Sequence, residues 1–329
     1  MLEVLMWTAR VLVVLAGIGA LFWVFGPYEP VDAENTFDAG SLPDDLDAYL
    51  AQSEAGVPGL RPGIHKRIHW HDTPGAQTDV AVVYIHGFSA TSEEIRPVPD
   101  RVAHALGANL YFTRLKGHGQ DGAAMAEATA GAWLRDVAEA YAIGRQIGRR
   151  VLVISTSTGS TLAAATVLDP TLSQGIIGHV FVSPNFALAN PAARLLNWPA
   201  ARYWAPLIAG RNRSFELQNE AHGAYWTSSY PTVATMPMVA IMRYVAGLDV
   251  TATQMPAMFM FSDADQVVSS AATRVVAAKW GGPVHLVPVT VGPDDDNDAH
   301  VIAGDILSPG MTDHAVLTIT NWARTIISP

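Results

Sequence analysis

The stretch Val151-Leu152-Val153-Ile154-Ser155-Thr156-Ser157-Thr158-Gly159 decides the fold, because it joins an apolar strand to a turn that carries a serine. Beyond the turn, Thr161-Leu162-Ala163-Ala164-Ala165 is typical of a helix. A serine on a sharp turn between a buried strand and a helix is the arrangement of a nucleophile elbow. Such a turn needs small residues two positions to either side of the serine, because the two backbones nearly touch there. Gly159 meets this need, whereas Ser155 stands where glycine is usual. The alternative interpretation is a Ser/Thr-rich turn with no chemical role.

Three more segments place reactive or polar groups at the ends of expected strands. An apolar run over 80–85 ends in His86-Gly87-Phe88-Ser89, whose glycine lets backbone N–H groups turn toward a ligand. A run over 257–261 leads to Ser262-Asp263-Ala264-Asp265, and a run over 284–289 precedes a polar loop that contains His300. Serine, acid and histidine therefore follow one another as Ser157, Asp265 and His300.

These segments together resemble the α/β-hydrolase superfamily, and within it the branch of esterases and monoacylglycerol-lipase-like serine hydrolases. The likeness covers residues 64–327. Its motifs are His86-Gly87-Phe88-Ser89, Leu115-Lys116-Gly117-His118-Gly119, the turn around Ser157, Asp265 with the Val-Val that follows, and His300. The resemblance implies a mostly parallel eight-stranded sheet, flanking helices and a helical cap inserted after strand 6. The chain departs from the pattern at Ser155 and at Lys116, where proline is frequent, but neither departure removes a catalytic group.

The expected mechanism is that of a serine hydrolase. A serine hydroxyl is a weak nucleophile and needs an oriented base, so we assign Ser157 as nucleophile, His300 as general base and acid, and Asp265 as its carboxylate partner. Backbone N–H groups of Phe88 and Thr158 would form the oxyanion hole. Three further residues would contact substrate: His86, Gly87 and Ser89. This chemistry calls for no metal and no organic cofactor.

Two other carboxylates compete for the role given to Asp265. Asp263 also lies just beyond the expected strand, and Asp298 lies two residues before His300. The resemblance selects Asp265, because the branch places its acid immediately before x-Val-Val. Asp298 is too near His300 in the chain to aim well at its ring.

The sequence divides into four parts. Residues 1–28 form a transmembrane anchor or a signal sequence, and residues 29–63 form a linker with a short helix, with Ser41 as the expected N-cap. Residues 64–183 and 254–329 form the core, and residues 184–253 form the cap. The cap segment lacks strand–helix alternation and is rich in Pro, Met and aromatic residues, which favours an apolar acyl chain as ligand.

The N-terminus predicts export of the rest of the chain. Residues 4–25 contain only one charge, Arg10, and as a helix they would reach about 33 Å, enough for a hydrocarbon core of about 30 Å. Arg10 before the span and the acidic residues after it favour an N-terminus inside and a catalytic domain on the extracytoplasmic side, periplasmic or extracellular. A cleaved signal peptide, cut near Gly17-Ile18-Gly19 or Ile18-Gly19-Ala20, is the alternative and would yield a secreted enzyme.

Composition restricts the partners. A formal charge of −10 argues against nucleic acid, whose phosphates an acidic surface repels. The chain has no cysteine, so thiolate chemistry, disulfides and Cys-ligated zinc are excluded. Asp294-Asp295-Asp296-Asn297-Asp298 lacks the spacing of an EF-hand and is better interpreted as a solvated loop. The sequence does not predict an oligomeric state.

We therefore expect hydrolysis of a carboxylic ester with an apolar acyl group, a small-molecule or lipid ester, near a membrane. Two alternatives use the same three side chains, namely transfer of the acyl group to an alcohol and cleavage of N-terminal peptide bonds by an aminopeptidase. A third is a membrane-tethered binding protein that has the fold but no catalysis.

Overall fold

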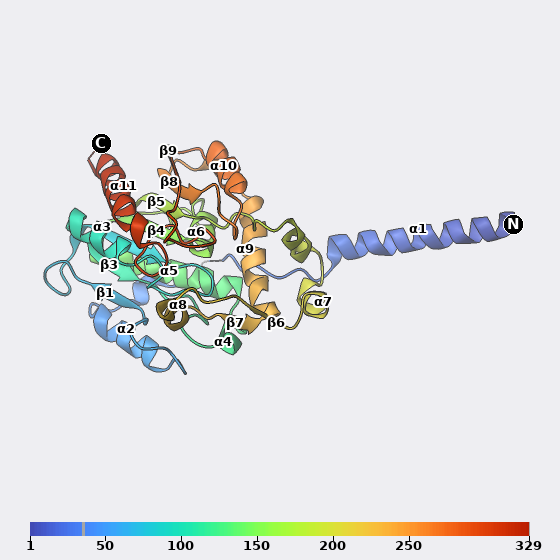
Figure 1. Cartoon of the computed structure of the whole chain (residues 1–329), viewed down its shortest axis with the longest axis horizontal. Helices are drawn as coiled ribbons and strands as arrows, with labels where there is room; N and C mark the ends of the chain where they lie inside the picture. The colour runs from blue at the N-terminus through green and yellow to red at the C-terminus, as the bar shows by residue number, and fades with distance from the viewer. Residues whose placement is uncertain (35–36, 329) are drawn as a thin grey trace.

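A seven-stranded sheet lies at the centre of the molecule, in a computed structural model that describes residues 1–34 and 37–328 (Figure 1). The strands are β1 Arg67–His69, β2 Thr78–Ile85, β3 Asn109–Phe112, β4 Gly148–Thr156, β5 Ile176–Val182, β8 Ala257–Ser262 and β9 Val284–Val289. Their order is β1-β3-β2-β4-β5-β8-β9, and only β1 runs antiparallel to its neighbour. The mostly parallel sheet is confirmed, but the expected count of eight is wrong for the described residues, because β1 is the only antiparallel strand at that edge.

Helices cover both faces of the sheet, which explains why its strands are continuous apolar runs. Along β2, Ala81, Val83 and Ile85 point into one core, and the alternate residues Val80, Val82 and Tyr84 point into the other. The first core is closed mainly by α5 Ala130–Ile147, α6 Thr158–Ala165, α9 Met236–Ala246 and α10 Ser270–Lys279. The second is closed by α3 Val98–Leu106 and α11 Pro309–Ile327.

The segment between β5 and β8 differs from a purely helical cap. It contains the 3-10 helices η2 Pro191–Asn197, η3 Thr232–Thr235 and η4 Val250–Ala252, and the α-helices α7 Ala201–Ile208, α8 Glu220–Tyr225 and α9. It also contains a two-stranded antiparallel sheet of β6 Asn212–Ser214 and β7 Ser229–Pro231. The insertion follows the fifth strand of this chain and not the sixth, because the sheet has one strand fewer than expected.

The short helix expected before the core is α2 Leu46–Ala55, and it packs against the body. Leu46 and Leu50 are buried, and the Glu54 carboxylate pairs with Arg114 through two 2.7 Å contacts. Its N-cap is Asp45, whose side chain accepts from Ala48 N at 2.9 Å, so the expectation of Ser41 is wrong. The body also contains another short helix, α4 Gly122–Ala126, and the 3-10 turn η1 Ala39–Ser41.

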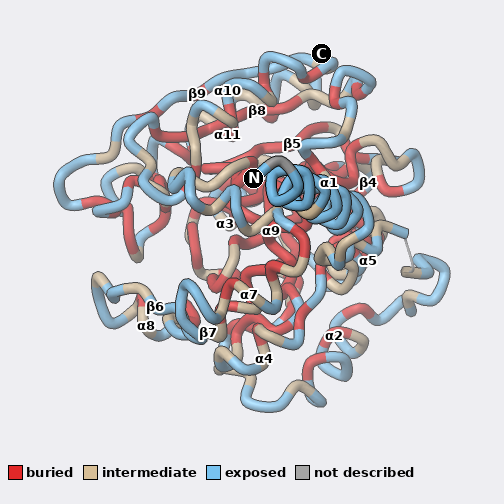
Figure 2. The backbone as a smooth tube through the Cα atoms, turned by 90° about the vertical axis from the view of Figure 1, so that its right-hand side faces the viewer, coloured by how far each residue is buried: buried red, intermediate tan, exposed pale blue. Residues whose placement is uncertain are grey.

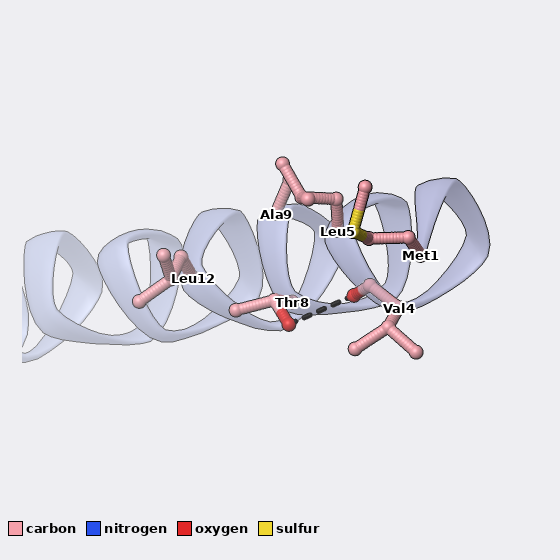
Figure 3. Close-up of a pocket in the computed structure, with 6 residues that line it drawn as sticks. All are labelled: Met1, Val4, Leu5, Thr8, Ala9 and Leu12. Carbon is pink, nitrogen blue, oxygen red and sulfur yellow. Dashed lines mark hydrogen bonds between the residues drawn. The ribbon is translucent and has the colours of Figure 1, made fainter.

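Helix α1 Leu2–Phe25 extends away from the body, and its described side chains are almost entirely exposed (Figures 1 and 2). Its span Glu3–Phe25 has a mean hydropathy of 2.0 and is long and apolar enough to cross a membrane, although a signal sequence has the same properties. Figure 3 shows the first turns, where the Thr8 hydroxyl donates to the Val4 carbonyl at 2.8 Å. This polar group therefore needs no partner outside the helix.

Candidate active site

Ser157 is the single residue between β4 and α6, and its backbone is strained. Its φ of 51° and ψ of −116° lie in a region that costs a non-glycine residue about 1–3 kcal/mol. Neighbouring backbone groups hold this conformation: Ser157 N–H donates to Val182 O at 2.9 Å, and Asn185 N–H donates to Ser157 O at 3.1 Å. The turn therefore presents the serine side chain at the carboxyl end of the sheet.

The two small residues that flank Ser157 meet different demands. A Cβ at Gly159 would lie 2.4 Å from Ile85 O and 2.6 Å from His86 O, so only glycine lets α6 approach β2 here. Ser155 is fully buried, and its hydroxyl donates to Val180 O of the next strand at 3.2 Å. A serine is tolerated in place of the usual glycine because its hydroxyl has a partner in the sheet.

The structure brings together Ser157, His300 and Asp265, which lie far apart in the sequence. Ser157 Oγ lies 3.1 Å from His300 Nε2, and His300 Nδ1 lies 2.9 Å from Asp265 Oδ2. The serine follows β4, the aspartate follows β8 and the histidine follows β9, so the three groups meet at one edge of the sheet. This chain of hydrogen bonds is able to pass a proton from the hydroxyl to the imidazole while the carboxylate holds the ring.

Asp265 is distinguished from the neighbouring acids by its contacts. Its Oδ1 accepts from the N–H groups of Val267 and Val268, both at 2.8 Å, which leaves Oδ2 for the imidazole. Asp263 is exposed and pairs with Arg274 at 2.6 Å. Asp298 is exposed, and its backbone carbonyl accepts from Gln266 N–H at 2.9 Å. The x-Val-Val pattern thus has a physical basis, since the two backbone N–H groups orient the acid.

The acidic loop before His300 is only partly the solvated loop that the sequence suggested. Asp294 and Asp298 are exposed, but Asp295 and Asp296 are buried. Asp296 Oδ2 accepts from His300 N–H at 2.9 Å and from Val301 N–H at 2.8 Å, and so fixes the histidine. Among the described residues no group of three His, Asp or Glu side chains is arranged to hold a metal ion.

The His86–Ser89 loop packs directly against the serine turn. A Cβ at Gly87 would lie 3.1 Å from Ser157 Cβ. Thr158 is the first residue of α6, so its N–H has no acceptor within the helix. In the described parts of the chain, neither this N–H nor that of Phe88 donates to another residue. Both N–H groups therefore remain available as hydrogen-bond donors.

The residues of this loop have partners of their own. The His86 ring is fully buried, its Nε2 accepts from Leu115 N–H at 3.1 Å and its Nδ1 lies 2.9 Å from Gly87 O. The ring that we expected to contact substrate thus joins two loops. Ser89 is buried, and its carbonyl accepts from Thr227 N–H at 2.8 Å. The Phe88 ring packs edge-on against Tyr230, with centroids 5.1 Å apart.

Glu94 is a buried carboxylate at the site, and the sequence analysis did not predict it. Its Oε2 accepts from Gly87 N–H at 2.6 Å and from the Tyr84 hydroxyl at 3.0 Å. Burial raises the pKa of Glu94 to about 7, against the lowering effects of the Gly87 hydrogen bond and of His300. The adjacent Glu93 points elsewhere and pairs with Arg67 and Arg96. No local pattern in the sequence separates the two glutamates.

The electrostatics of His300 favour the protonated ring. Burial lowers the pKa of His300, but the hydrogen bond from its ring to Asp265 and the charge of that carboxylate outweigh burial. The pKa of His300 therefore lies above its usual value. An imidazole with this bias is suited to accept a proton from Ser157.

The insertion between β5 and β8 touches both sides of the site. Tyr230 contacts Phe88 of the first loop, while Gln218 Nε2 donates to Asp296 Oδ1 at 2.6 Å beside His300. Several of its buried apolar side chains belong to the two cores of the body: Phe186, Met238, Ile241 and Met242 to the first, and Trp226 to the second. These side chains therefore stabilise the insertion on the core.

The sheet order, the serine turn and the three converging side chains define the α/β-hydrolase fold. The chain belongs to the family described as serine aminopeptidase, S33, whose model matches residues 76–286. The matched region contains Ser157 and Asp265 and ends before His300.

A curated relative is similar to part of this chain. A thermostable monoacylglycerol lipase from Bacillus sp. (strain H-257) is 35% identical over 83 residues, which cover 25% of this chain and 33% of the relative. The chain thus matches about a third of that curated protein.

Solved structures share the fold at low sequence identity. A metagenome-derived lipolytic enzyme superposes with a TM-score of 0.62 at 18% identity, covering 82% of this chain and 98% of that one. The monoacylglycerol lipase of Paleococcus ferrophilus gives 0.57 at 13% identity, covering 80% and 98%. A soluble variant of monoglyceride lipase from Saccharomyces cerevisiae gives 0.54 at 14% identity, covering 80% and 92%. At these identities the likeness concerns the fold alone.

Proposed function

We propose that this protein is a serine hydrolase that cleaves carboxylic esters with an apolar acyl group. The observation that carries the proposal is the hydrogen-bonded chain from Ser157 Oγ through His300 to Asp265, with distances of 3.1 and 2.9 Å. The family and the monoacylglycerol lipase relative support an ester hydrolase as the class.

The reaction proceeds in two halves. His300 Nε2 takes the proton of Ser157 as Oγ attacks the ester carbonyl carbon, and the carbonyl π pair moves onto oxygen. The N–H groups of Phe88 and Thr158 bind this oxyanion, and each donor contributes about 3 kcal/mol to stabilisation of the transition state. When the tetrahedral species collapses, the bond to the alcohol oxygen breaks and His300 returns the proton to that oxygen. An acyl-serine remains.

Water then replaces the alcohol. His300 removes a proton from water as the water oxygen attacks the acyl carbon, and the second tetrahedral species expels Ser157 Oγ. His300 reprotonates this oxygen and the carboxylic acid leaves. Throughout, Asp265 stabilises the charged imidazolium, and Glu94 holds the Gly87 peptide beside the oxyanion donors.

An apolar acyl group fits the surroundings of Phe88. This ring stands edge-on to Tyr230, Trp133 and His118, with centroid distances of 5.1, 6.2 and 5.9 Å. The curated relative is a lipase, which also favours a lipid ester over a peptide. An acyltransferase or an aminopeptidase would use the same triad, but no contact among the described residues of the site favours either.

The proposed organisation follows the boundaries derived from the sequence. Residues 1–28 anchor the protein, 29–63 link the anchor to the core, 64–183 and 254–329 form the hydrolase core, and 184–253 form the cap. We place the catalytic part on the extracytoplasmic side of the membrane. A secreted form released by signal cleavage is the alternative.

Substrate preference tests the proposal. The full chain in detergent is assayed with p-nitrophenyl esters of increasing acyl length, with aminoacyl p-nitroanilides, and with an ester plus a competing alcohol. We expect ester hydrolysis that rises with acyl length and is absent from Ser157→Ala. Faster anilide cleavage would favour the aminopeptidase, and a new ester as main product would favour the acyltransferase. No turnover of any substrate by the wild type would leave the non-catalytic binding protein.

A further inference from the structure

The base of α1 is fixed to the insertion by a set of specific contacts. The Ala200 N–H donates to Pro27 O at 2.7 Å, and the Glu29 carboxylate pairs with Arg202 at 2.5 and 2.8 Å. Arg243 of α9 donates to Glu29 O at 2.6 Å. The direction in which α1 leaves the body is therefore set by contacts with the start of α7 and with α9, and Figure 1 shows α7 close to the base of α1.

The same part of the insertion exposes large apolar side chains. Tyr203 and Leu207 lie one turn apart on α7, on the face opposite the buried Ala201 and Ala205. A helix at a water-facing surface normally carries polar residues on this outer face. Leu207 is 78% exposed. Together with exposed residues of η2 and the α7 end they form what we call the apolar patch, which consists of Leu195, Trp198, Tyr203, Leu207 and Ile208.

Trp198 shows at which height along the α1 axis the apolar patch lies. Its ring packs edge-on against Trp23, with centroids 5.7 Å apart. Trp23 lies two residues before the end of α1, at the position where tryptophan marks the boundary between hydrocarbon and headgroups. A bilayer that surrounds α1 up to Trp23 therefore reaches Trp198.

Charge around the patch has the sign that favours anionic headgroups. In a chain of net charge −10, residues 191–215 contain four arginines and neither Asp nor Glu. Arg202 pairs with Glu29, while Arg194, Arg211 and Arg213 are exposed. The exposed arginines lie in the same stretch of chain as the patch, and we call them the arginine rim. Apolar and arginine side chains without acids are the composition of segments that lie in a membrane interface.

We propose that the apolar patch is a membrane-docking surface that inserts into the headgroup region of the same bilayer that α1 spans. The proposal rests on α1 being a membrane anchor. Because this insertion also contacts the loops of Phe88 and His300, docking would hold the candidate site at the lipid surface and at a fixed orientation.

The absence of cysteine from the chain makes a direct test possible. Single variants Leu207→Cys in the patch, Leu15→Cys in α1 and Leu317→Cys on α11 each carry a nitroxide label; all three leucines are exposed, at 78%, 57% and 62%. The full-length proteins are reconstituted into phosphatidylcholine vesicles with phosphatidylglycerol. Electron paramagnetic resonance then compares the access of oxygen, which concentrates in lipid, with that of a water-soluble nickel chelate.

We expect the labels at 207 and 15 to show a several-fold higher ratio of oxygen to nickel access than the label at 317. A label at 207 that behaves like the label at 317, while the label at 15 lies in lipid, would overturn the docking surface and leave the anchor intact. If the label at 15 also stays in water, both the anchor and the docking surface are overturned. The ester assay in detergent is independent of all these outcomes.

The arginine rim provides a second readout. With the label at 207, we expect greater nickel protection in vesicles with phosphatidylglycerol than in phosphatidylcholine alone, and loss of this difference in Arg211→Gln/Arg213→Gln. An unchanged difference in the double variant would contradict the role of the rim.

Discussion

The Glu94 carboxylate accepts a hydrogen bond from the Gly87 backbone N–H at 2.6 Å, inside the body and directly beneath the loop that faces Ser157. The bond fixes the His86–Gly87 peptide. The next peptide along the chain carries the Phe88 N–H, a proposed oxyanion donor. The same carboxylate oxygen accepts from the Tyr84 hydroxyl at 3.0 Å. A buried acid in this place makes the stability of the protein depend on pH.

Replacement of Glu94 by glutamine should remove that dependence. Burial raises the pKa of Glu94 to about 7, whereas glutamate in an unfolded chain titrates near about 4.3. The folded state thus binds the proton more tightly, so the contribution of this group is fully present below the unfolded pKa and is lost as pH rises through the folded pKa. Relative to wild type, Glu94→Gln should gain about 3 kcal/mol of unfolding free energy between these two pKa values. Urea denaturation at each pH measures this, and a pH-independent difference would contradict it.

Asparagine at position 265 should abolish most of the activity, and asparagine at position 263 should not. Asp265→Asn loses the charge that orients and stabilises the imidazolium, for which a loss of about 10⁴ in kcat is expected. Asp263 is exposed and contacts Arg274, so Asp263→Asn should stay within a few-fold of wild type. Measurement of ester turnover by the two matched variants tests this ranking. The opposite ranking would make Asp263 the catalytic acid.

The pH profile of kcat/KM should report the environment of His300. Only the neutral ring accepts the serine proton, and the pKa of His300 is raised because Asp265 outweighs burial. Activity should therefore fall on the acid side at a pH above about 6.5, the value for a free imidazole. In Asp265→Asn the remaining effect of burial should move this limb to lower pH. An acid limb that stays in place in the variant would show that another group titrates.

Alanine at position 159 should destabilise the fold, because its Cβ would lie 2.4 Å from the Ile85 carbonyl oxygen. Overpacking typically costs about 1–3 kcal/mol, and here the contacted atoms are backbone and cannot move aside easily. The matched control is Gly56→Ala, where no atom lies within 4 Å and φ is negative. Thermal unfolding compares the variants. Equal melting temperatures would mean that α6 does not approach β2 this closely.

The fold and the central side chains were accessible to sequence reasoning because each depends on a local pattern. The buried strands are apolar runs in the sequence, and the turn at Ser157 is indicated by the glycine two positions later, Gly159. The choice of Asp265 over Asp263 depended on the Val-Val that follows, and the structure supplies the reason in the N–H groups of Val267 and Val268.

Other features were inaccessible because they depend on contacts between distant segments. Glu94 and Glu93 are adjacent and identical in type, and only the folded chain separates the one beneath Gly87 from the one beside Arg67. The His86 ring looked available for substrate, but its acceptor role toward Leu115 N–H joins residues 29 positions apart. The expected count of eight strands came from the resemblance and not from the residues of this chain. The β6–β7 pair was missed because strands of three residues carry little periodicity.

Formation of an acyl-serine tests the central claim most directly. The full-length protein is mixed with a slowly hydrolysed p-nitrophenyl ester, quenched in acid and analysed by intact and peptide mass spectrometry. We predict a mass increase of one acyl group on the peptide that contains Ser157, a burst of p-nitrophenol, and neither signal in Ser157→Ala. Ester turnover at the wild-type rate by Ser157→Ala, or acylation of another residue, would contradict the account.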